Sequence, residues 1–392
     1  MAKSFRSGVS LHSHTNQSRE TLKFLAVLGS RYAFMRQLME RLEQRAMVNH
    51  GMRVDYGLSY WTPPAHPTLA FDLERGQIER LGLAAMVSLT DHDSIQACLS
   101  LQGGPESRNC PISLEWTVPF GGEAFHFGVH NLPSARSSEW MQILSSYTLY
   151  PTNGQLKEIL AALHAEPGVL FVFNHPMWDL YGVGADLHVH SVNAFLREHR
   201  EWIHALELNG LRSWAENRSA CSLAEQWEMV LVSGGDRHSL EPNANINLTN
   251  AECFDEFACE IRDKKMSRIL FMPQYAQPLK HRVLQSAVDV VSHYPHFPAG
   301  SQRWDERVYH PDARGNPQSL ATLWPDGTAP RAIRWGIAIV LLMGRGVFSG
   351  GLRAAWSEAR ELAQALEEQG TGGGLYPRLV PLPRKHRSDA GA

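Results

Sequence analysis

Short apolar runs alternate with longer amphipathic stretches along the first three quarters of the chain. Buried strands are predicted at the apolar runs of residues 83–89, 168–173, 204–209, 229–232 and 268–272. A period-two pattern at residues 111–118 and 123–130, on either side of a turn with two glycines, predicts an antiparallel hairpin. Strands that alternate with helical segments are typical of βα units around a parallel sheet or barrel. The pattern therefore predicts an α/β fold up to residue 292.

Amphipathic periodicity places helices between these strands. They are predicted at residues 31–47, 69–81, 156–164, 195–203, 217–226, 251–264 and 278–291. Residues 55–64 combine aromatic side chains with two prolines, which predicts a loop inside an insert of about residues 25–66. This loop is a candidate wall of a substrate pocket. Trp116, Trp178 and Trp214 could belong to the same wall or to the core.

The pattern changes after residue 293. Residues 298–330 predict a loop-rich segment, and residues 332–366 predict two helical segments interrupted at 344–351. The tail to residue 392 is rich in Gly and Pro, so we expect it to be partly disordered. Two units are therefore predicted: an α/β domain at 1–292, and a C-terminal extension at 293–392 that is mostly helical or irregular.

Composition narrows the classes of protein. The 392 residues include 43% hydrophobic and 20% charged residues with a net charge of -3, which excludes wholesale disorder. No dense basic cluster precedes residue 384, so no nucleic-acid partner is expected. Five scattered cysteines without a CxxC pair, and a first segment without an apolar leader, predict a cytoplasmic protein. The apolar run at 336–344 is too short to span a bilayer, so no membrane partner is expected.

Candidate chemistry begins at His12-Ser13-His14. If residues 9–14 form a strand, the two imidazoles share one face, because side chains two positions apart lie on the same side of a strand. Imidazole is a ligand for zinc, iron, manganese and nickel. By itself the motif is a weak signal, since many such pairs are surface or packing residues.

Further candidate ligands follow the predicted strands. Asp91 and His92 come after the strand at 83–89, His175 after 168–173, and Asp236 with His238 after 229–232. Functional groups of α/β proteins collect at the carboxyl ends of parallel strands. These positions therefore predict one shared site.

A carboxylate in the predicted hairpin requires a partner. Glu115 lies among apolar residues, where an unpaired carboxylate costs several kcal/mol, so it needs a cation or an arginine. His126 and His130 lie on one face of the second strand and either could join Glu115. We prefer His126, because His130 precedes a turn and could be a turn residue.

The chain resembles the PHP superfamily, named for polymerase and histidinol phosphatase. The resemblance rests on the order of five motifs between residues 8 and 292: His12-Ser13-His14, Thr90-Asp91-His92-Asp93, Glu115 with His126, His175-Pro176, and Gly235-Asp236-Arg237-His238. It implies a distorted (β/α)7 barrel that holds two or three divalent metal ions, such as zinc, manganese or iron, at the carboxyl ends of its strands.

The resemblance also implies ligand sets. One ion would be bound by His12, His14, Glu115 and Asp236, and a second by Glu115, His126 and His175. A third would use His92, His238 and a group shortly after the first motif. Many relatives carry an Asp-Gly pair about five residues after the second histidine, whereas this chain has Ser18-Arg19-Glu20-Thr21. Glu20 is the predicted replacement.

The implied chemistry is hydrolysis of a small phosphomonoester by a hydroxide held between two cations. Arg19 and Arg237 are predicted clamps for phosphate oxygens, with an ion-pairing role as the alternative, and Arg212 is a weaker candidate. Asp91, His238 or a metal-bound water could protonate the leaving group.

Two alternatives to a phosphatase remain. The same chemistry could cleave a phosphodiester or a carboxylic ester or amide, and a chain without turnover could be a binding protein whose extension docks a partner. The oligomeric state stays open. A second pair, His188 and His190, resembles the first motif locally, but it lies at the wrong place in the motif order. We assign it to a loop near the site.

Overall fold

The computed structural model describes seven stretches of the chain. They are residues 5–22, 33–50, 54–103, 109–152, 154–312, 314–324 and 327–345. The second helical segment predicted within 332–366 and the predicted tail lie outside these residues.

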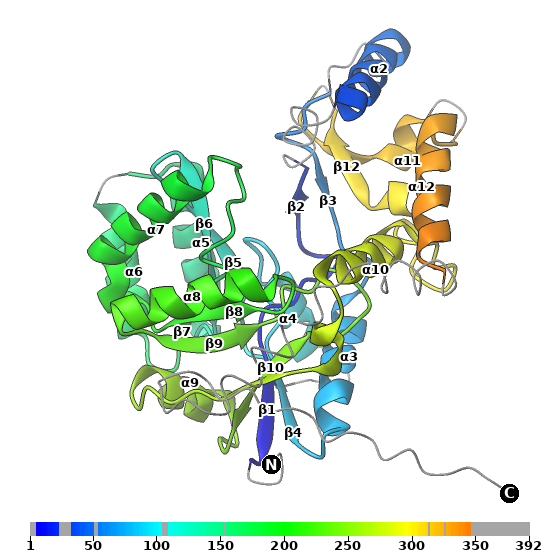
Figure 1. Cartoon of the computed structure of the whole chain (residues 1–392). Helices are drawn as coiled ribbons and strands as arrows, with labels where there is room; N and C mark the ends of the chain where they lie inside the picture. Colours follow the sequence, from blue (N-terminus) through cyan, green and yellow to red (C-terminus); the bar gives the residue numbers. More distant parts are fainter. Residues whose placement is uncertain are drawn as a thin grey trace, which may run out of the picture.

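A five-stranded sheet forms one half of the main body. Its order is β5-β6-β7-β8-β9, with bounds Leu114–Phe120, Glu123–His130, Leu170–Phe173, Ala205–Asn209 and Val230–Gly234. β5 to β7 are antiparallel neighbours and β7 to β9 are parallel, so the predicted hairpin and the predicted parallel strands are confirmed. Helices α5 (Ser137–Leu149), α6 (Gln155–Ala165), α7 (Ala185–His199) and α8 (Trp214–Trp227) lie around this sheet (Figure 1).

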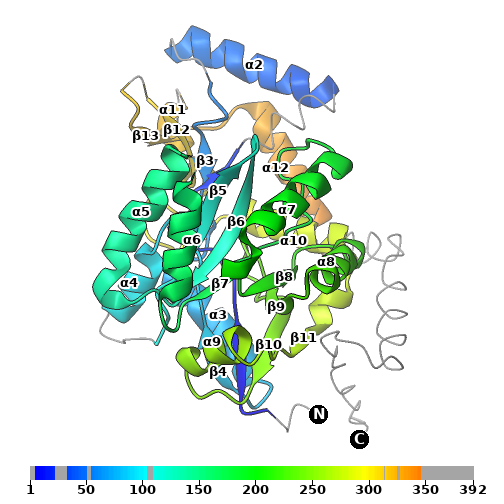
Figure 2. The ribbon, with the colours of Figure 1, turned by 90° about the vertical axis from the view of Figure 1, so that its left-hand side faces the viewer.

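A smaller sheet forms the other half. Its order is β11-β10-β1-β4, with bounds Ile269–Phe271, Asn245–Thr249, Ser7–Ser10 and Ala84–Val87. Helices α3 (Pro67–Glu79), α4 (Gln96–Gln102) and α9 (Phe254–Arg262) accompany it. Figure 2 shows β1 and β4 running side by side at the lower end of the molecule, as their parallel pairing requires.

Strand β10 and helix α5 were not predicted. β10 alternates polar with apolar residues, but two of its polar residues are asparagines, which are depleted in strands and common in turns, and both of its faces are buried. Each of its two asparagines bonds a neighbouring strand: Asn245 Nδ2 donates to the carbonyl of Leu208 at 2.8 Å, and Asn247 Nδ2 to that of Ser233 at 3.1 Å. These bonds give both buried amide nitrogens a partner.

Two single bridges join the sheets. Ser13 pairs with Arg237 beyond the ends of β1 and β9, and His92 pairs with Glu115 beyond the end of β4. Over the described residues the ladders do not close into a barrel. The mixed α/β class is confirmed, and the (β/α)7 barrel stays a prediction.

A third sheet combines the insert with the extension. Its order is β13-β12-β3-β2, all antiparallel, with bounds Pro317–Ser319, Val308–Pro311, Tyr60–Trp61 and Glu20–Thr21. The predicted loop at 55–64 therefore contains a strand. The predicted domain boundary at residue 292 stays a prediction, but segments from both sides of it share this sheet.

Four helices accompany the third sheet. They are α2 (Ala33–His50), α10 (Leu279–Val291), α11 (Leu320–Leu323) and α12 (Arg331–Met343), at the upper right of Figure 1. Close packing at Gly344 fixes α12 against α10, because a Cβ there would lie 2.3 Å from Val288 Cγ2. Among the helices of the described residues, none is long and apolar enough to cross a membrane.

Candidate metal centre

His12 and His14 reach the site by a route that differs from the predicted one. β1 ends at Ser10, and His12 has a φ of 64°, so the two histidines do not lie on one strand. The prediction of a shared strand face was wrong. Instead, backbone bonds to the end of β9 hold the segment: Asp236 N donates to the His12 carbonyl at 2.8 Å, and His14 N to the Arg237 carbonyl at 2.9 Å. Both rings still reach the same carboxylate.

That carboxylate is the fully buried Glu115 of β5. Its Oε2 lies 3.1 Å from His12 Nε2, 3.3 Å from His14 Nε2 and 3.3 Å from His92 Nε2. A single oxygen cannot form good hydrogen bonds with three ring nitrogens, and His12 Nε2, His14 Nε2 and Glu115 Oε2 have no hydrogen-bond partner among the described residues. Buried polar atoms without partners are rare in native proteins.

A divalent ion accounts for these atoms. Metal–nitrogen and metal–oxygen bonds of about 2.0–2.2 Å separate neighbouring ligand atoms by about 2.8–3.6 Å, the shorter values in octahedral and the longer in tetrahedral geometry. The separations at Glu115 Oε2 fall in this range. Imidazole nitrogen with carboxylate oxygen is also a suitable donor set for zinc, manganese or iron. The residues therefore fit a metal.

The other oxygen of Glu115 faces a second pair of histidines. Oε1 lies 3.1 Å from His175 Nε2 and 3.5 Å from His126 Nδ1, and it accepts a hydrogen bond from Asn174 Nδ2 at 3.0 Å. Glu115 thus stands between two groups of nitrogens. His130 lies elsewhere: its Nδ1 is 2.8 Å from Ser88 Oγ.

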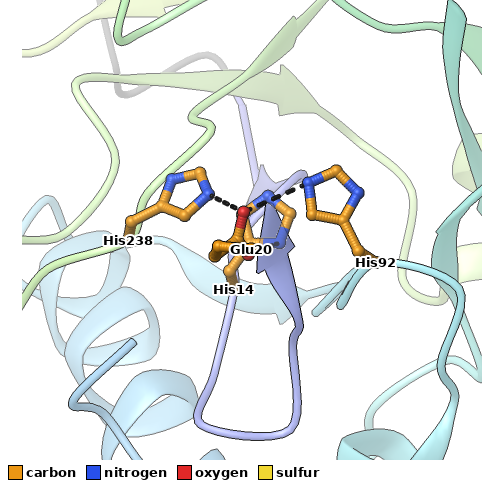
Figure 3. A group of neighbouring side chains, drawn as sticks. All are labelled: His14, Glu20, His92 and His238. Carbon is orange, nitrogen blue, oxygen red and sulfur yellow. Dashed lines mark ion pairs between the residues drawn. The ribbon is translucent and has the colours of Figure 1, made fainter. Parts of the chain in front are cut away.

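A third group surrounds Glu20, at the start of β2 (Figure 3). Its Oε2 lies 3.0 Å from His238 Nε2 and 3.3 Å from His92 Nε2, and Oε1 lies 3.6 Å from His14 Nδ1. The four side chains have spacing suited to a metal ion. The structure therefore places Glu20 where the predicted third ligand set requires a carboxylate.

Asp236 approaches the centre from the end of β9. Its Oδ1 lies 3.6 Å from the Nε2 atoms of His12 and His14, and its Oδ2 accepts hydrogen bonds from Asn209 Nδ2 at 3.2 Å and Arg212 Nη2 at 3.1 Å. The backbone of Asp236 has a φ of 54°. Left-handed backbone at non-glycine residues is uncommon and clusters at functional sites.

Glu207 supports the centre and was not predicted as a site residue. Its buried Oε1 lies 2.6 Å from His12 Nδ1, and its Oε2 accepts from the backbone N–H of His175 at 2.8 Å. Such carboxylates orient metal-bound imidazoles and raise their basicity. A glutamate in the apolar strand 204–209 was the available signal. Gly234 makes room for it, since a Cβ there would lie 1.6 Å from Glu207 Oε1.

Charges within the centre balance one another. Burial alone would lower the pKa of His12, but the carboxylates of Glu115, Glu207 and Asp236 raise it well above its ordinary value. Burial alone would raise the pKa of Glu20, but His238 and His92 hold it well below its ordinary value. Carboxylates that remain charged in a buried site are suited to bind cations.

Three of the predicted catalytic residues, Asp91, Arg237 and Arg19, have different burial and different contacts. Both oxygens of Asp91 accept hydrogen bonds from Thr15, and burial raises the pKa of Asp91 to about 7. The buried Arg237 forms an ion pair with Glu74 at 2.8 Å, which is the alternative role considered above. The exposed Arg19 lies over the ring of Tyr60. Their catalytic roles stay predictions.

Arg212, the weaker candidate, contacts the proposed ligand Asp236. Its guanidinium stacks 3.6 Å from the ring centroid of Trp178 and forms an ion pair with Asp236. Trp116 and Trp214 are buried in the core. Trp178 instead faces a cavity.

The second histidine pair does not lie in a loop. His188 and His190 lie in α7, which begins at Ala185, so that prediction was wrong; the buried face of the helix starts at His188 and continues through Val192 and Phe195. His190 is exposed, whereas His188 is buried with its Nδ1 2.7 Å from Glu123. His188, Glu123 and Asp179 form a separate group whose ligand atoms have spacing suited to a metal ion.

One cavity of about 1420 Å³ opens onto the metal centre. Glu20, His92, His126, His175, Asp236 and His238 line it, together with Arg19 and Arg212. Tyr56 and Trp61 from the predicted loop at 55–64 also line it, so this segment does form part of the wall.

Comparison with known proteins gives little more. No protein-family profile and no curated protein matches the chain. Solved structures that match include an amidohydrolase from Chromobacterium violaceum with bound sulfate and no metal, at 14% identity and a TM-score of 0.31, covering 45% of this chain and 84% of that one. PsfC from Pseudomonas syringae matches at 14% identity and a TM-score of 0.37, covering 69% of this chain and 93% of that one.

A proposed metal-dependent phosphoesterase from Bifidobacterium adolescentis matches at 15% identity and a TM-score of 0.31, covering 51% of this chain and 91% of that one. At TM-scores of 0.31 to 0.37 these likenesses carry no argument about function.

Proposed function

We propose that this chain is a metal-dependent phosphoesterase of the PHP superfamily that hydrolyses a phosphomonoester. The observation that carries the proposal is the convergence of His12 Nε2 and His14 Nε2 on Glu115 Oε2, three unpartnered atoms with metal-like spacing from two segments far apart in the sequence. These segments carry two of the motifs on which the resemblance rests. The fold expected for the family is the distorted (β/α)7 barrel.

The proposed ligands form three overlapping groups. They are His12, His14 and Glu115; His92, Glu115 and His126; and His14, Glu20, His92 and His238. His175 and Asp236 complete the set, at the second oxygen of Glu115 and beside the first pair of histidines. Bound divalent ions would supply a hydroxide at neutral pH and offset negative charge at phosphorus.

The other residues bind and orient the substrate. Arg212 is held by Trp178 and Asp236 and lines the cavity, so it is the proposed contact for a non-bridging phosphate oxygen. Arg19 lines the same cavity and supplies a second positive charge. In the reaction, water adds to phosphorus, the ester P–O bond breaks, and the leaving oxygen takes a proton to give an alcohol and inorganic phosphate.

A substrate panel tests this proposal. Full-length protein loaded with manganese, zinc or iron is assayed with p-nitrophenyl phosphate, bis-p-nitrophenyl phosphate and a p-nitrophenyl carboxylic ester. We expect the monoester to be hydrolysed fastest and His12→Ala and Asp236→Ala to lose at least about a hundredfold in rate. Faster hydrolysis of the diester or the carboxylic ester would show that the enzyme cleaves that kind of bond and not a phosphomonoester. Full metal occupancy without any hydrolysis would indicate a binding protein.

A further inference from the structure

The cavity has two chemically different ends. One end carries the proposed metal ligands and the cations of Arg19 and Arg212. The other is walled by apolar side chains of α10, α11 and α12, among them Val290, Leu323 and Ile337. A ligand that fills both ends must itself be polar at one end and apolar at the other.

The size of the cavity exceeds what a small phosphate ester needs. Its volume of about 1420 Å³ lies above the range of about 300–1,000 Å³ that holds typical small-molecule ligands. A short phosphomonoester placed at the metal centre would leave the apolar end filled with water. The wall would then gain nothing from its apolar composition.

Among the described residues, the apolar wall is only partly covered by other side chains. Ile333 and Ile337 of α12 and Val290 of α10 are only half-buried, although their helices contact each other closely at Gly344 and Val288. Apolar surface left open to water in a concave site marks a binding surface. Since the cavity is continuous with the metal centre, the occupant should reach from one to the other.

We infer that the substrate is a phosphomonoester of an alcohol with an extended apolar chain, whose phosphate lies at the metal centre and whose chain lies against α10, α11 and α12. This inference rests on the proposed function and narrows its substrate class. Hydrolysis breaks the same P–O bond, and the products are inorganic phosphate and the apolar alcohol.

A chain-length series tests the inference. Metal-loaded full-length protein is assayed with ethyl, butyl, octyl and dodecyl phosphate below their micelle concentrations, with inorganic phosphate as the readout. Binding of the matching alkylphosphonates, whose P–C bond is not hydrolysed, is measured by calorimetry. We expect kcat/KM and phosphonate affinity to rise roughly two- to fourfold for each buried methylene, up to the length of the cavity.

Two isoleucines of α12 give a matched pair of variants. Ile337 lines the cavity, whereas Ile339 is 53% exposed and does not line it. Ile337→Asn should weaken octylphosphonate binding about five- to tenfold and leave ethylphosphonate binding within about twofold. Ile339→Asn should leave both unchanged, and far-UV circular dichroism checks that both variants fold.

The outcomes separate this inference from the proposed function. Hydrolysis and phosphonate binding that do not depend on chain length would overturn the inference and leave the phosphatase proposal standing. Phosphonate binding that tightens with chain length, without hydrolysis of any ester, would support the apolar subsite and overturn the phosphatase proposal. Equal effects of Ile337→Asn and Ile339→Asn would also overturn the inference.

Discussion

At the scale of single residues, the centre depends on side chains that never touch the ligand. Glu207 illustrates this: it holds His12 through one oxygen and the backbone of His175 through the other. Its second oxygen also accepts from Asn209 Nδ2 at 2.9 Å. A neutral amide in its place cannot accept at both positions.

Glu207→Gln should therefore lower metal affinity about 10- to 100-fold, because His12 loses its charged partner and the new NH₂ group faces other donors. Metal affinity is measured by competition with a fluorescent chelator. Glu252→Gln, at a carboxylate whose side chain is 72% exposed, is the control and should have no effect. Equal affinities of wild type and Glu207→Gln would show that Glu207 does not orient His12.

The sequence predicted the ligand types better than the reasons for their positions. Six of the nine predicted metal ligands follow strand ends, which periodicity can locate, whereas Glu115, His126 and Glu20 lie within strands. Backbone turns such as the positive φ of His12, and partner choices such as Arg237 with Glu74, depend on segments distant in sequence. Arg212 was ranked below Arg237 because adjacency to a motif is visible in a sequence and stacking on Trp178 is not.

At the scale of elements, strands β7 and β8 are joined by a histidine. Phe171 N donates to His204 Nδ1 at 2.9 Å, and His204 N donates to the Phe171 carbonyl at 2.9 Å. His204 Nε2 lies 3.0 Å from His164 Nδ1. Burial, with the nearby charge of Arg262, lowers the pKa of His204 to about 2.

This pairing predicts a pH dependence of stability. Between about pH 6.5 and 2 the unfolded chain binds a proton at His204 that the folded chain does not, so the free energy of unfolding should fall as pH decreases below 6.5. The free energy of unfolding is measured by urea denaturation at pH 7.5 and 5.5, with EDTA present so that no metal is bound. His204→Gln should flatten this fall by up to about 1.4 kcal/mol per pH unit. His190→Gln, at an exposed histidine, should leave the fall unchanged. If His204→Gln loses stability with decreasing pH as steeply as wild type, His204 does not cause the pH dependence.

Element prediction succeeded where periodicity was regular. The apolar strands β7, β8 and β9 and the hairpin of β5 and β6 were located from pattern alone. β10 was missed because its buried positions carry Asn, and buried amides are revealed only by their partners. β3 was missed because two residues shortly before Pro63 and Pro64 form a strand only where β2 and β12 pair with them.

At the scale of the whole molecule, the third sheet ties Glu20 to the extension. β2 pairs with β3, and β3 pairs with β12, while Thr62 N donates to the Arg307 carbonyl at 2.8 Å. Two-residue strands are not stable by themselves. No local pattern in the sequence could have predicted this link.

Tyr309→Pro should therefore reduce metal bound at the Glu20 group, because proline cannot donate to the ladder between β12 and β3. Elemental analysis should find fewer ions per chain than in wild type, while the ions at Glu115 remain. A chain that ends at residue 292 should show the same loss. Unchanged metal content in folded protein, as judged by circular dichroism, would show that Glu20 does not need the sheet.

The link between Glu20 and β12 also determines the order in which the ligand groups can assemble during translation. Val308 is translated 288 residues after Glu20 (308 minus 20). At about 5–20 residues per second this delay is about 15 to 60 seconds. The ligands of the groups at Glu115 end at Asp236, and β10, which pairs with β1, ends at Thr249, so these groups can assemble on the ribosome before the Glu20 group does. The ribosome therefore has to reach residue 308 before Glu20, near the start of the chain, can take its final place beside His14, His92 and His238.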